Sequence, residues 1–572
     1  MAHGLALTVR TPKKNQMTVR FLVSNNNVAY RYELPLMNDG ETQIIKVYSE
    51  ASSFRFPEHT TTFLSPQITP MTGWKRSKPS YEEEYVPDAP MATKSKFGVG
   101  YTFPCLFKIV DGVAPGESGK KLARTNEYWV LVSETGVTSQ YCGSRLSDYT
   151  PATGYTVAFP QAGENNGVGS AEPAMGLPNQ TPWRTLTIGS TLAPVVETTV
   201  PYDVVEPLYT PKTQYRPGRY TWSWLIWQDN SANYDDQVRF IDLAAKMGYE
   251  YCLVDALWDT QIGYQGIERL ANYAKRKNVR LLLWYNSNGM QNDAPQGPRN
   301  VMSNTIARKR EMAWLNSIGV AGIKVDFFGG DKQATMKLYE DILSDANDYG
   351  LQVIFHGCTL PRGWERMYPN YVASEAALAS ENVFFSEHHA NREGFEMTMH
   401  PFCRNAVGSF DWGGVIMNHY LSKDNKSRHA RKTTDIFELA TAITNQTSVN
   451  CVAVTPNVID EVPAAEQELL RQLPTTWSDT RFVAGYPTRY AVIARQDSKS
   501  GHWYVGGLNG TDKAMTLTLQ LPMLAGKRVK VYCDAPRKAL EPMGSVVCDK
   551  QVKTDGSLKV TLQPMGGLVV VE

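Results

Sequence analysis

The residues best suited to chemistry are Lys324 and Asp326, two positions apart in the apolar stretch KVDFF. Because side chains alternate along a β-strand, both would point to the same side of a strand formed there. An ammonium group and a carboxylate are costly to bury unless they are paired or take part in a reaction. We therefore interpret Lys324 and Asp326 as parts of a functional site.

Further polar and aromatic side chains stand where neighbouring apolar stretches end. They are Asp229, Asp255, Trp258, Asp259, Trp284, Asn286, Asn288, His356, Glu375 and Glu381. Simpler explanations exist for several of them, because an aspartate at a strand end often caps the next element. His356 could be a hydrogen-bonded core histidine, and Glu375 and Glu381 could be solvated surface charges. Brought together, these residues would form a ring of carboxylates with a lysine, a histidine and several tryptophans.

A pair of carboxylates beside aromatic rings, without a cysteine nucleophile or a phosphate-binding loop, best fits glycoside hydrolysis. One carboxylate attacks the anomeric carbon or activates a water molecule. The other, with a raised pKa, protonates the leaving oxygen.

The elements that would hold these residues alternate between apolar strands and amphipathic helices over residues 216–477. We expect strands at 221–227, 249–259, 279–286, 321–328 and 351–357, followed by less regular ones at 371–375, 382–385 and 451–456. This alternation is typical of a parallel sheet covered by helices. Eight strands predict a (β/α)₈ TIM barrel with its catalytic groups at the carboxyl ends of the strands. A doubly wound sheet is the alternative, although no Gly-x-Gly-x-x-Gly follows the first strand.

Both flanking regions are rich in strand patterns. Residues 1–215 combine alternating apolar residues with Gly, Pro and Asn turns, which predicts a large β-sandwich. Residues 478–572 return to short strands and predict a compact antiparallel β domain. The fold class is therefore α/β and β multidomain.

Composition excludes several functional classes. Lys and Arg number 58 against 57 Asp and Glu, so the chain lacks the basic field of a nucleic-acid-binding protein. No apolar run approaches the roughly 20 residues that span a bilayer. The eight cysteines are spread singly without a Cys-x-x-Cys pair, which argues against a zinc ribbon. No secretory signal is visible at Met1.

At the level of motifs, the chain resembles glycoside hydrolase family 97, bacterial calcium-dependent exo-acting α-glycosidases common in gut Bacteroidetes. The matching stretches are NNNVAYRYELP, WVLVSETGV, GRYTWSWLIW, YCLVDALWD, GIKVDFF, IFHGCTLPRGWERMYPN with the following Glu375 and Glu381, and HPFCRNAVGSFDW. They cover nearly the whole chain. The resemblance implies an N-terminal β-super-sandwich, a (β/α)₈ barrel and a C-terminal β domain.

Members of this family use either an inverting or a retaining mechanism, and the resemblance implies the retaining one for this chain. Inverting members carry base glutamates at the ends of strands 3 and 5, where this chain has Asn286 or Asn288 and Gly357. Retaining members, chiefly α-galactosidases, carry an aspartate nucleophile on strand 4, which Asp326 matches. The resemblance thus implies Asp326 as nucleophile and Glu381 as general acid/base.

The resemblance also implies a Ca²⁺ ion held by Glu134, Glu375 and Glu381, with Lys324 and His356 contacting the substrate. Calcium prefers six to eight oxygen ligands, so waters or carbonyls would complete its shell. Strand-end geometry adds Asp255, Trp258 and Trp284 as substrate-binding candidates.

Our main hypothesis from the sequence is a retaining, calcium-dependent exo-α-galactosidase acting on an oligosaccharide or glycoside. The alternatives are a retaining glycosidase on a related sugar, a β-L-arabinopyranosidase or an α-glucosidase, and a non-catalytic carbohydrate-binding protein on a degenerate barrel. Family members usually start with a secretory signal and further strands. We therefore expect either a truncated N-terminus or a smaller sandwich, and the resemblance implies a periplasmic or secreted protein.

Overall fold

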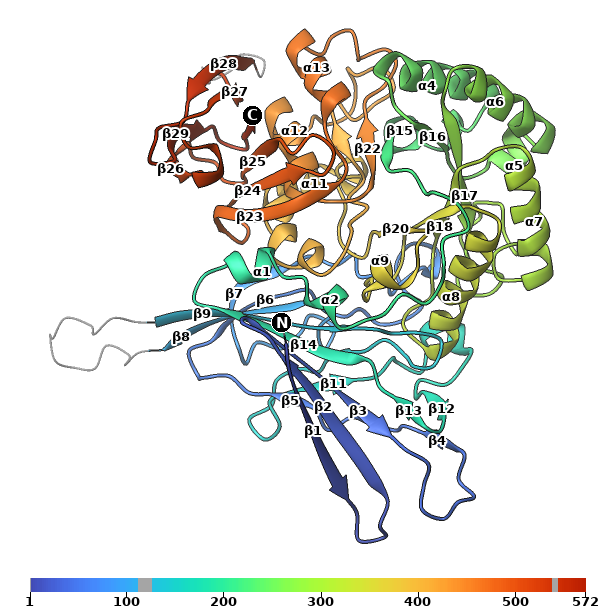
Figure 1. Cartoon of the computed structure of the whole chain (residues 1–572). Helices are drawn as coiled ribbons and strands as arrows, with labels where there is room; N and C mark the ends of the chain where they lie inside the picture. The colour runs from blue at the N-terminus through green and yellow to red at the C-terminus, as the bar shows by residue number, and fades with distance from the viewer. Residues whose placement is uncertain (1, 112–125, 537–543) are drawn as a thin grey trace, which may run out of the picture.

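The computed structural model describes residues 2–111, 126–536 and 544–572. Its three regions follow the chain: an N-terminal β domain, a central barrel and a C-terminal β domain (Figure 1). The predicted fold class is confirmed. No helix among the described residues combines the length and apolar character needed to cross a membrane.

The N-terminal domain is built around a nine-stranded antiparallel sheet, counted over the described residues. Its order is β1 (His3–Arg10), β2 (Gln16–Val23), β3 (Asn27–Leu34), β14 (Trp183–Gly189), β9 (Asn126–Thr135), β8 (Cys105–Asp111), β6 (Thr61–Leu64) and β7 (Val86–Pro90), with β13 (Asn179–Gln180) beside β3. The alternation of apolar and polar residues seen in the sequence leaves one face of this sheet for the core. β1 forms an edge and exposes Leu5, Leu7 and Val9.

The smaller elements of this domain complete its surface. They are β4 (Ile44–Lys46), β5 (Ser53–Phe54), β10 (Arg145–Leu146), β11 (Tyr155–Ala158), β12 (Ala174–Gly176), α1 (Ala193–Val196) and α2 (Val200–Asp203). Buried apolar side chains of this domain and of the barrel form one continuous cluster. The two regions therefore share a core.

The barrel contains eight parallel strands within the described residues. They are β15 (Gly218–Trp222), β16 (Tyr251–Val254), β17 (Arg280–Asn286), β18 (Gly322–Asp326), β19 (Gln352–Phe355), β20 (Tyr371–Ser374), β21 (Val415–Ile416) and β22 (Val449–Ala453). From β15 to β20 each strand pairs with the next along the chain, and β15 also pairs with β22. This order excludes the doubly wound alternative, in which the strand order reverses at a switch point.

Helices with a clear sequence signature surround the strands (Figure 1). They are α4 (Tyr234–Met247), α6 (Tyr264–Arg276), α7 (Thr305–Ser317), α8 (Gln333–Asp348), α11 (Glu387–Met397), α12 (Asp435–Thr444) and α13 (Ala464–Gln472), with the single turns α3 (Trp224–Trp227), α5 (Trp258–Gln261), α9 (Trp364–Met367) and α10 (Asn382–Phe385). Asn233 caps α4 by accepting from the Asp236 backbone N–H, and Gly248 ends the helix in the left-handed region.

Three predicted strands are wrong in part or as a whole. The stretch at 249–259 is a strand only over Tyr251–Val254, and its end belongs to the helical turn α5. The apolar stretch at 221–227 is a strand as far as Trp222, and Trp224–Trp227 then form one helical turn closed by the Gln228 N–H and the Trp224 carbonyl. The stretch at 382–385 is the helical turn α10. Short apolar runs satisfy either conformation, and neighbouring strands decide which one is adopted.

The seventh strand is irregular. Ahead of β21, Phe410 forms a parallel bridge to Ser374, and the Asp411 N–H donates to the Ser374 carbonyl. The Phe410 N–H donates to the Gln446 carbonyl just before β22. Residues around Asp411 thus lie between β20 and β22 and bring its side chain to the barrel end.

The C-terminal domain is a six-stranded antiparallel sheet with a two-stranded one against it, counted over the described residues. The six strands are β23 (Trp477–Tyr486), β24 (Tyr490–Asp497), β25 (Trp503–Asn509), β30 (Gly567–Val571), β27 (Arg528–Asp534) and β28 (Ser545–Gln551), and the pair is β26 (Met515–Gln520) and β29 (Ser557–Leu562). This sheet packs on α12 beside the barrel (Figure 1).

A buried ion-pair group joins the N-terminal domain to the barrel. Glu134, on β9, accepts from Arg362 Nε at 2.6 Å, from the Ser144 N–H at 2.8 Å and from the Arg184 guanidinium. Arg362 precedes α9 of the barrel, and all three charged side chains are at most 1% exposed. Glu134 is therefore the counter-ion of two buried arginines.

Replacing Glu134 by alanine would leave both guanidinium groups buried without that counter-ion. We expect Glu134→Ala to lose about 3–5 kcal/mol of stability, measured as a fall in the thermal unfolding midpoint. Glu127→Ala is the matched control, because Glu127 lies on the same strand with a side chain 48% exposed. Exposed ion pairs contribute about 0–1 kcal/mol. Equal shifts in the two variants would contradict this role of Glu134.

Candidate active site

A cavity of about 500 Å³ opens at the carboxyl ends of the barrel strands. Six successive strands contribute Trp222, Asp255, Trp284, Lys324 with Asp326, His356 and Glu375, and Glu381 follows the last of these strands. The connection between β6 and β7 of the N-terminal domain reaches over the barrel and adds Trp74, Ser77, Lys78, Ser80 and Glu82. Two domains therefore build this site.

Asp326 is held by two hydrogen bonds at the end of β18. Its Oδ2 accepts from Trp284 Nε1 at 3.1 Å and its Oδ1 from the Phe327 backbone N–H at 2.7 Å. Burial raises the pKa of Asp326 to about 6, against the opposing effect of His356 and Lys324. Phe327 adopts φ +67°, a strained conformation of the kind that gathers at functional sites.

Lys324 is buried and pairs with a residue that the sequence did not indicate. Its Nζ lies 3.3 Å from Asp411 Oδ2 and 3.9 Å from the centre of the Trp222 ring. The same Asp411 oxygen lies 3.1 Å from His356 Nδ1. Burial acts to raise the pKa of Asp411, but the nearby Lys324 and His356 outweigh it and lower that pKa well below its usual range.

His356, Glu375 and Glu381 form a compact buried cluster. His356 Nε2 lies 3.0 Å from Glu381 Oε1 and 3.2 Å from Glu375 Oε1. Burial and the carboxylate of Glu82 raise the pKa of Glu375 well above its usual value. Burial opposes ionisation of Glu381 as well, but the charge of His356 and its hydrogen bond lower the pKa of that carboxyl.

This cluster has the chemistry of a cation site. One ligand atom from each of its three residues lies within 4.8 Å of the others. Glu375 Oε1 and Glu381 Oε2 are buried without a hydrogen-bond donor, and Glu82 stands at the same cavity wall. Unsatisfied buried carboxylate oxygens from several chain segments suit a hard cation such as Ca²⁺.

Most of the predicted site residues come together in this cavity. Asp326, Glu381, Glu375, Lys324, His356, Asp255 and Trp284 all line it. Asp255 accepts from Trp222 Nε1 at 2.7 Å, and burial raises the pKa of its carboxyl to about 6.

Trp258 and Glu134 are not brought to the cavity. The Trp258 ring is fully buried behind the strand ends, stacks on Trp314 and donates from Nε1 to the Trp284 carbonyl. It supports Trp284 and does not face the cavity, because Leu257 turns the chain with φ +70° ahead of α5. Both Glu134 oxygens are occupied by arginine and serine donors, as described above, and Glu82 is the acidic residue that the N-terminal domain supplies.

The residues that the sequence did not reveal are Asp411, Glu82, Trp222, Trp74 and Phe385. Glu82 had a weak signal, the run of three glutamates at positions 82–84. Asp411 stands in the matching stretch HPFCRNAVGSFDW, but nothing in the sequence assigned it to the site, because it lies in an irregular segment whose place between β20 and β22 depends on the closed barrel.

Comparison with protein families gives matches along the chain. The model described as Glycosyl-hydrolase 97 N-terminal matches residues 2–207, Glycoside hydrolase 97 matches residues 218–377, and Glycosyl-hydrolase 97 C-terminal, oligomerisation, matches residues 476–571.

Two curated relatives align over most of the chain. A protein named probable retaining alpha-galactosidase from Streptomyces bingchenggensis is 27% identical over 570 residues, covering 96% of this chain and 76% of the relative. A retaining alpha-galactosidase from Bacteroides thetaiotaomicron is 25% identical over 603 residues, covering 99% of this chain and 85% of the relative.

A solved structure described as a beta-arabinopyranosidase is more similar. It is 52% identical, superposes with a TM-score of 0.94 and covers 100% of this chain and 87% of its own. Because models of one family match all three regions, this chain belongs to glycoside hydrolase family 97.

Proposed function

We propose that this protein is a retaining exo-glycosidase that releases terminal β-L-arabinopyranose, with Asp326 as nucleophile and Glu381 as general acid/base. Support for the sugar comes from the 52% identity to a beta-arabinopyranosidase over the whole chain, against 25–27% for the retaining alpha-galactosidases. This choice takes the alternative named from the sequence over the α-galactosidase hypothesis.

One observation carries the retaining mechanism: the backbone of Gly357 lies against the carboxylate of Asp326. A Cβ at position 357 would stand 2.4 Å from Asp326 Oδ1 and 2.9 Å from the Phe327 nitrogen. A base glutamate at the end of this strand, which an inverting mechanism would use, cannot coexist with Asp326 in its present position. This contact therefore supports direct attack by Asp326.

The reaction then follows double displacement. An Asp326 oxygen attacks the anomeric carbon while the bond to the leaving oxygen breaks and Glu381 donates a proton to that oxygen. In the second step Glu381 takes a proton from water, the water oxygen bonds to the anomeric carbon, and the ester to Asp326 breaks. Two inversions give net retention.

In this scheme His356 shares a proton with the general acid/base, Glu381. Burial alone would lower the pKa of its imidazole, but Glu375, Glu381 and Asp411 raise that pKa well above 6.5. The raised pKa favours the doubly protonated ring, which lies between Asp411 at Nδ1 and Glu381 at Nε2. A proton shared along the Nε2–Oε1 contact lets Glu381 act as an acid although its own pKa is lowered.

Calcium is the cation we propose for the carboxylate cluster, with Glu375, Glu381 and Glu82 as its protein ligands. A bound divalent cation would supply electrostatic polarisation of the acid or of substrate hydroxyls. The side chains described here bind and orient the sugar and hold the transferred proton.

The shape of the cavity fits an exo-acting enzyme. The sugar would occupy the closed end among Asp255, Trp284 and Lys324. Trp74 and Phe385 line the same cavity with rings 51% and 49% exposed, so the leaving group would lie between them at the mouth.

A second candidate is α-galactosidase activity. The names of the two curated relatives favour it, and β-L-arabinopyranose differs from α-galactose only by lacking the exocyclic CH₂OH. Both sugars present the same hydroxyl configuration to the side chains at the closed end of the cavity.

The sugar assignment is tested with p-nitrophenyl β-L-arabinopyranoside and p-nitrophenyl α-galactoside, each with and without a calcium chelator. We expect kcat/KM to favour the arabinoside by about 10–200-fold, the range that one small substituent provides. Both activities should fall with the chelator, and NMR of the first-released sugar should show the retained anomer. Preference for the galactoside would support the second candidate, and an inverted product would exclude Asp326 as nucleophile.

Gly357→Ala tests the contact that selects the mechanism. The new methyl group would displace Asp326, and we expect kcat to fall at least about 100-fold, because a displacement near 1 Å costs about that much. Position 357 also has φ +46°, so backbone strain contributes.

Gly319→Ala is the control that separates the effect of backbone strain from that of the steric clash with Asp326. Gly319 has φ +80° with open space around its Cβ position, remote from the cavity. It should lower stability slightly and leave kcat unchanged. Full activity in Gly357→Ala would show that Asp326 does not depend on this contact.

The pKa of Asp326 sets the acid side of the pH profile. A carboxyl with a pKa of about 6 is protonated below that pH and cannot attack, so kcat/KM should fall tenfold per pH unit below about pH 6. Trp284→Phe removes a hydrogen bond that stabilises the carboxylate, so the midpoint should move up by about one pH unit. A midpoint near pH 4 in the unmodified protein would contradict the assignment.

A further inference from the structure

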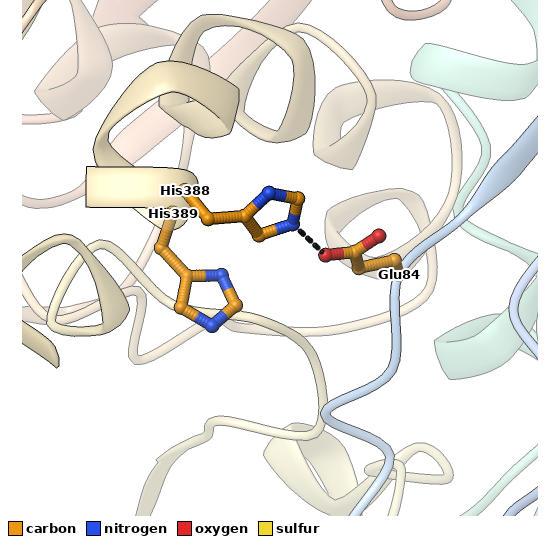
Figure 2. Close-up of side chains that lie close together, drawn as sticks. All are labelled: Glu84, His388 and His389. Atoms are coloured by element: carbon orange, nitrogen blue, oxygen red, sulfur yellow. Dashed lines mark hydrogen bonds and ion pairs between the residues drawn. The ribbon is translucent and has the colours of Figure 1, made fainter. Parts of the chain in front are cut away.

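A second group of metal-ligating side chains lies outside the cavity, where the N-terminal domain meets the start of α11. It consists of Glu84, His388 and His389 (Figure 2), and one ligand atom from each lies within 4.8 Å of the others. His388 Nε2 is 2.6 Å from Glu84 Oε1, and the two imidazole rings are 5.4 Å apart between centres.

The local fold explains why adjacent residues of one helix converge here. Ser386 caps α11, and its hydroxyl accepts from the His389 backbone N–H at 3.2 Å. This places both histidines in the first turn, where their rings share a space with the Glu84 carboxylate (Figure 2). Glu84 comes from the segment just before β7, so the group joins two domains.

The types of ligand atom in this group determine which cations it would bind. Two imidazoles and one carboxylate suit borderline ions such as Zn²⁺, whereas Ca²⁺ requires more oxygens. Ligand atoms around tetrahedral zinc stand roughly 3.3 Å apart, from zinc–nitrogen distances of about 2.0–2.1 Å. His388 is exposed and the other two side chains are partly exposed, so small side-chain rotations can reach this spacing.

Nearby side chains include one competing cation and two further carboxyl groups. Arg392 is the closest competitor, with Nε 3.6 Å from Glu84 Oε1, but its guanidinium bonds to Glu396 at 2.7 Å on its own helix. Glu396 and Glu393 line a small cavity together with His389. Each of these two buried glutamates has one oxygen without a hydrogen-bond donor. Two buried carboxyl groups thus lie beside His389, on the side away from solvent.

We propose that Glu84, His388 and His389 bind Zn²⁺ or a similar borderline transition-metal ion, with water in the fourth position. The ion cross-links the N-terminal domain to the barrel, beside the two segments that carry Glu82 and Phe385 to the cavity. Its role is structural, and it is separate from the carboxylate cluster at His356.

The test uses the full-length protein stripped of metals and then saturated with Ca²⁺, which occupies the oxygen-rich site first. Zn²⁺ is added in a calorimetric titration and in thermal unfolding. We expect one zinc equivalent and a rise in the unfolding midpoint, both reduced in His388→Ala/His389→Ala and in Glu84→Gln, with at least a tenfold weaker affinity. Replacing zinc by Co²⁺ should give the visible absorption of a tetrahedral site.

His502→Ala is the control variant, because His502 is an exposed histidine in the C-terminal domain. It should bind zinc as the unmodified protein does. An unchanged zinc titration in the double histidine variant would overturn the proposal, as would binding that Glu375→Gln abolishes and the histidine variant does not. Absence of zinc binding in the unmodified protein would also overturn the proposal, and the group would then be only an ion pair between the two domains.

Discussion

Crowding of buried carboxyl groups is the constraint on which the rest of this site depends. Five carboxyl groups lie close to only two basic side chains, Lys324 and His356, in one region of the cavity. The carboxyl groups are those of Asp255, Asp326, Glu375, Glu381 and Asp411. Every carboxyl group there is desolvated, so those closest to a cation stay ionised and the others hold a proton more tightly. Asp411 is ionised between its two cations, whereas the pKa values of Asp326 and Asp255 rise to about 6.

The same imbalance suits the site to the Ca²⁺ ion that we propose for it. Glu375 Oε1 and Glu381 Oε2 accept no hydrogen bond, although Glu375 Oε1 lies 3.2 Å from His356 Nε2. Burying such oxygens is costly, and a proton or a metal ion would lower that cost. Because Glu82 comes from the N-terminal domain, the cluster is complete only when that domain is docked on the barrel. Docking in turn uses the buried arginine pairs of Glu134 and the shared apolar core.

The close contact between the Gly357 backbone and the Asp326 carboxylate is as important for the site as its charges. The absence of a side chain at Gly357 leaves room for the Asp326 carboxylate, and the Gly357 N–H donates to Glu375 at 2.8 Å. One glycine thus accommodates the carboxylate of Asp326, the proposed nucleophile, on one side and orients the carboxyl group of Glu375 on the other.

Much of this architecture could be predicted from the sequence by itself. Strand and helix patterns predicted the three regions and most of the barrel strands. Because parallel strands of a barrel end on the same face, the strand ends also predicted which residues meet at one rim: Asp255, Trp284, Lys324, Asp326 and His356. Tertiary structure decided the rest. Short runs such as residues 224–227 and 382–385 satisfy both strand and helix patterns, so their neighbours select the conformation. Asp411 and Glu82 reach the site through an irregular strand and a second domain, and Trp258 and Glu134 are turned away from it by contacts between residues far apart in the chain, which no local pattern records.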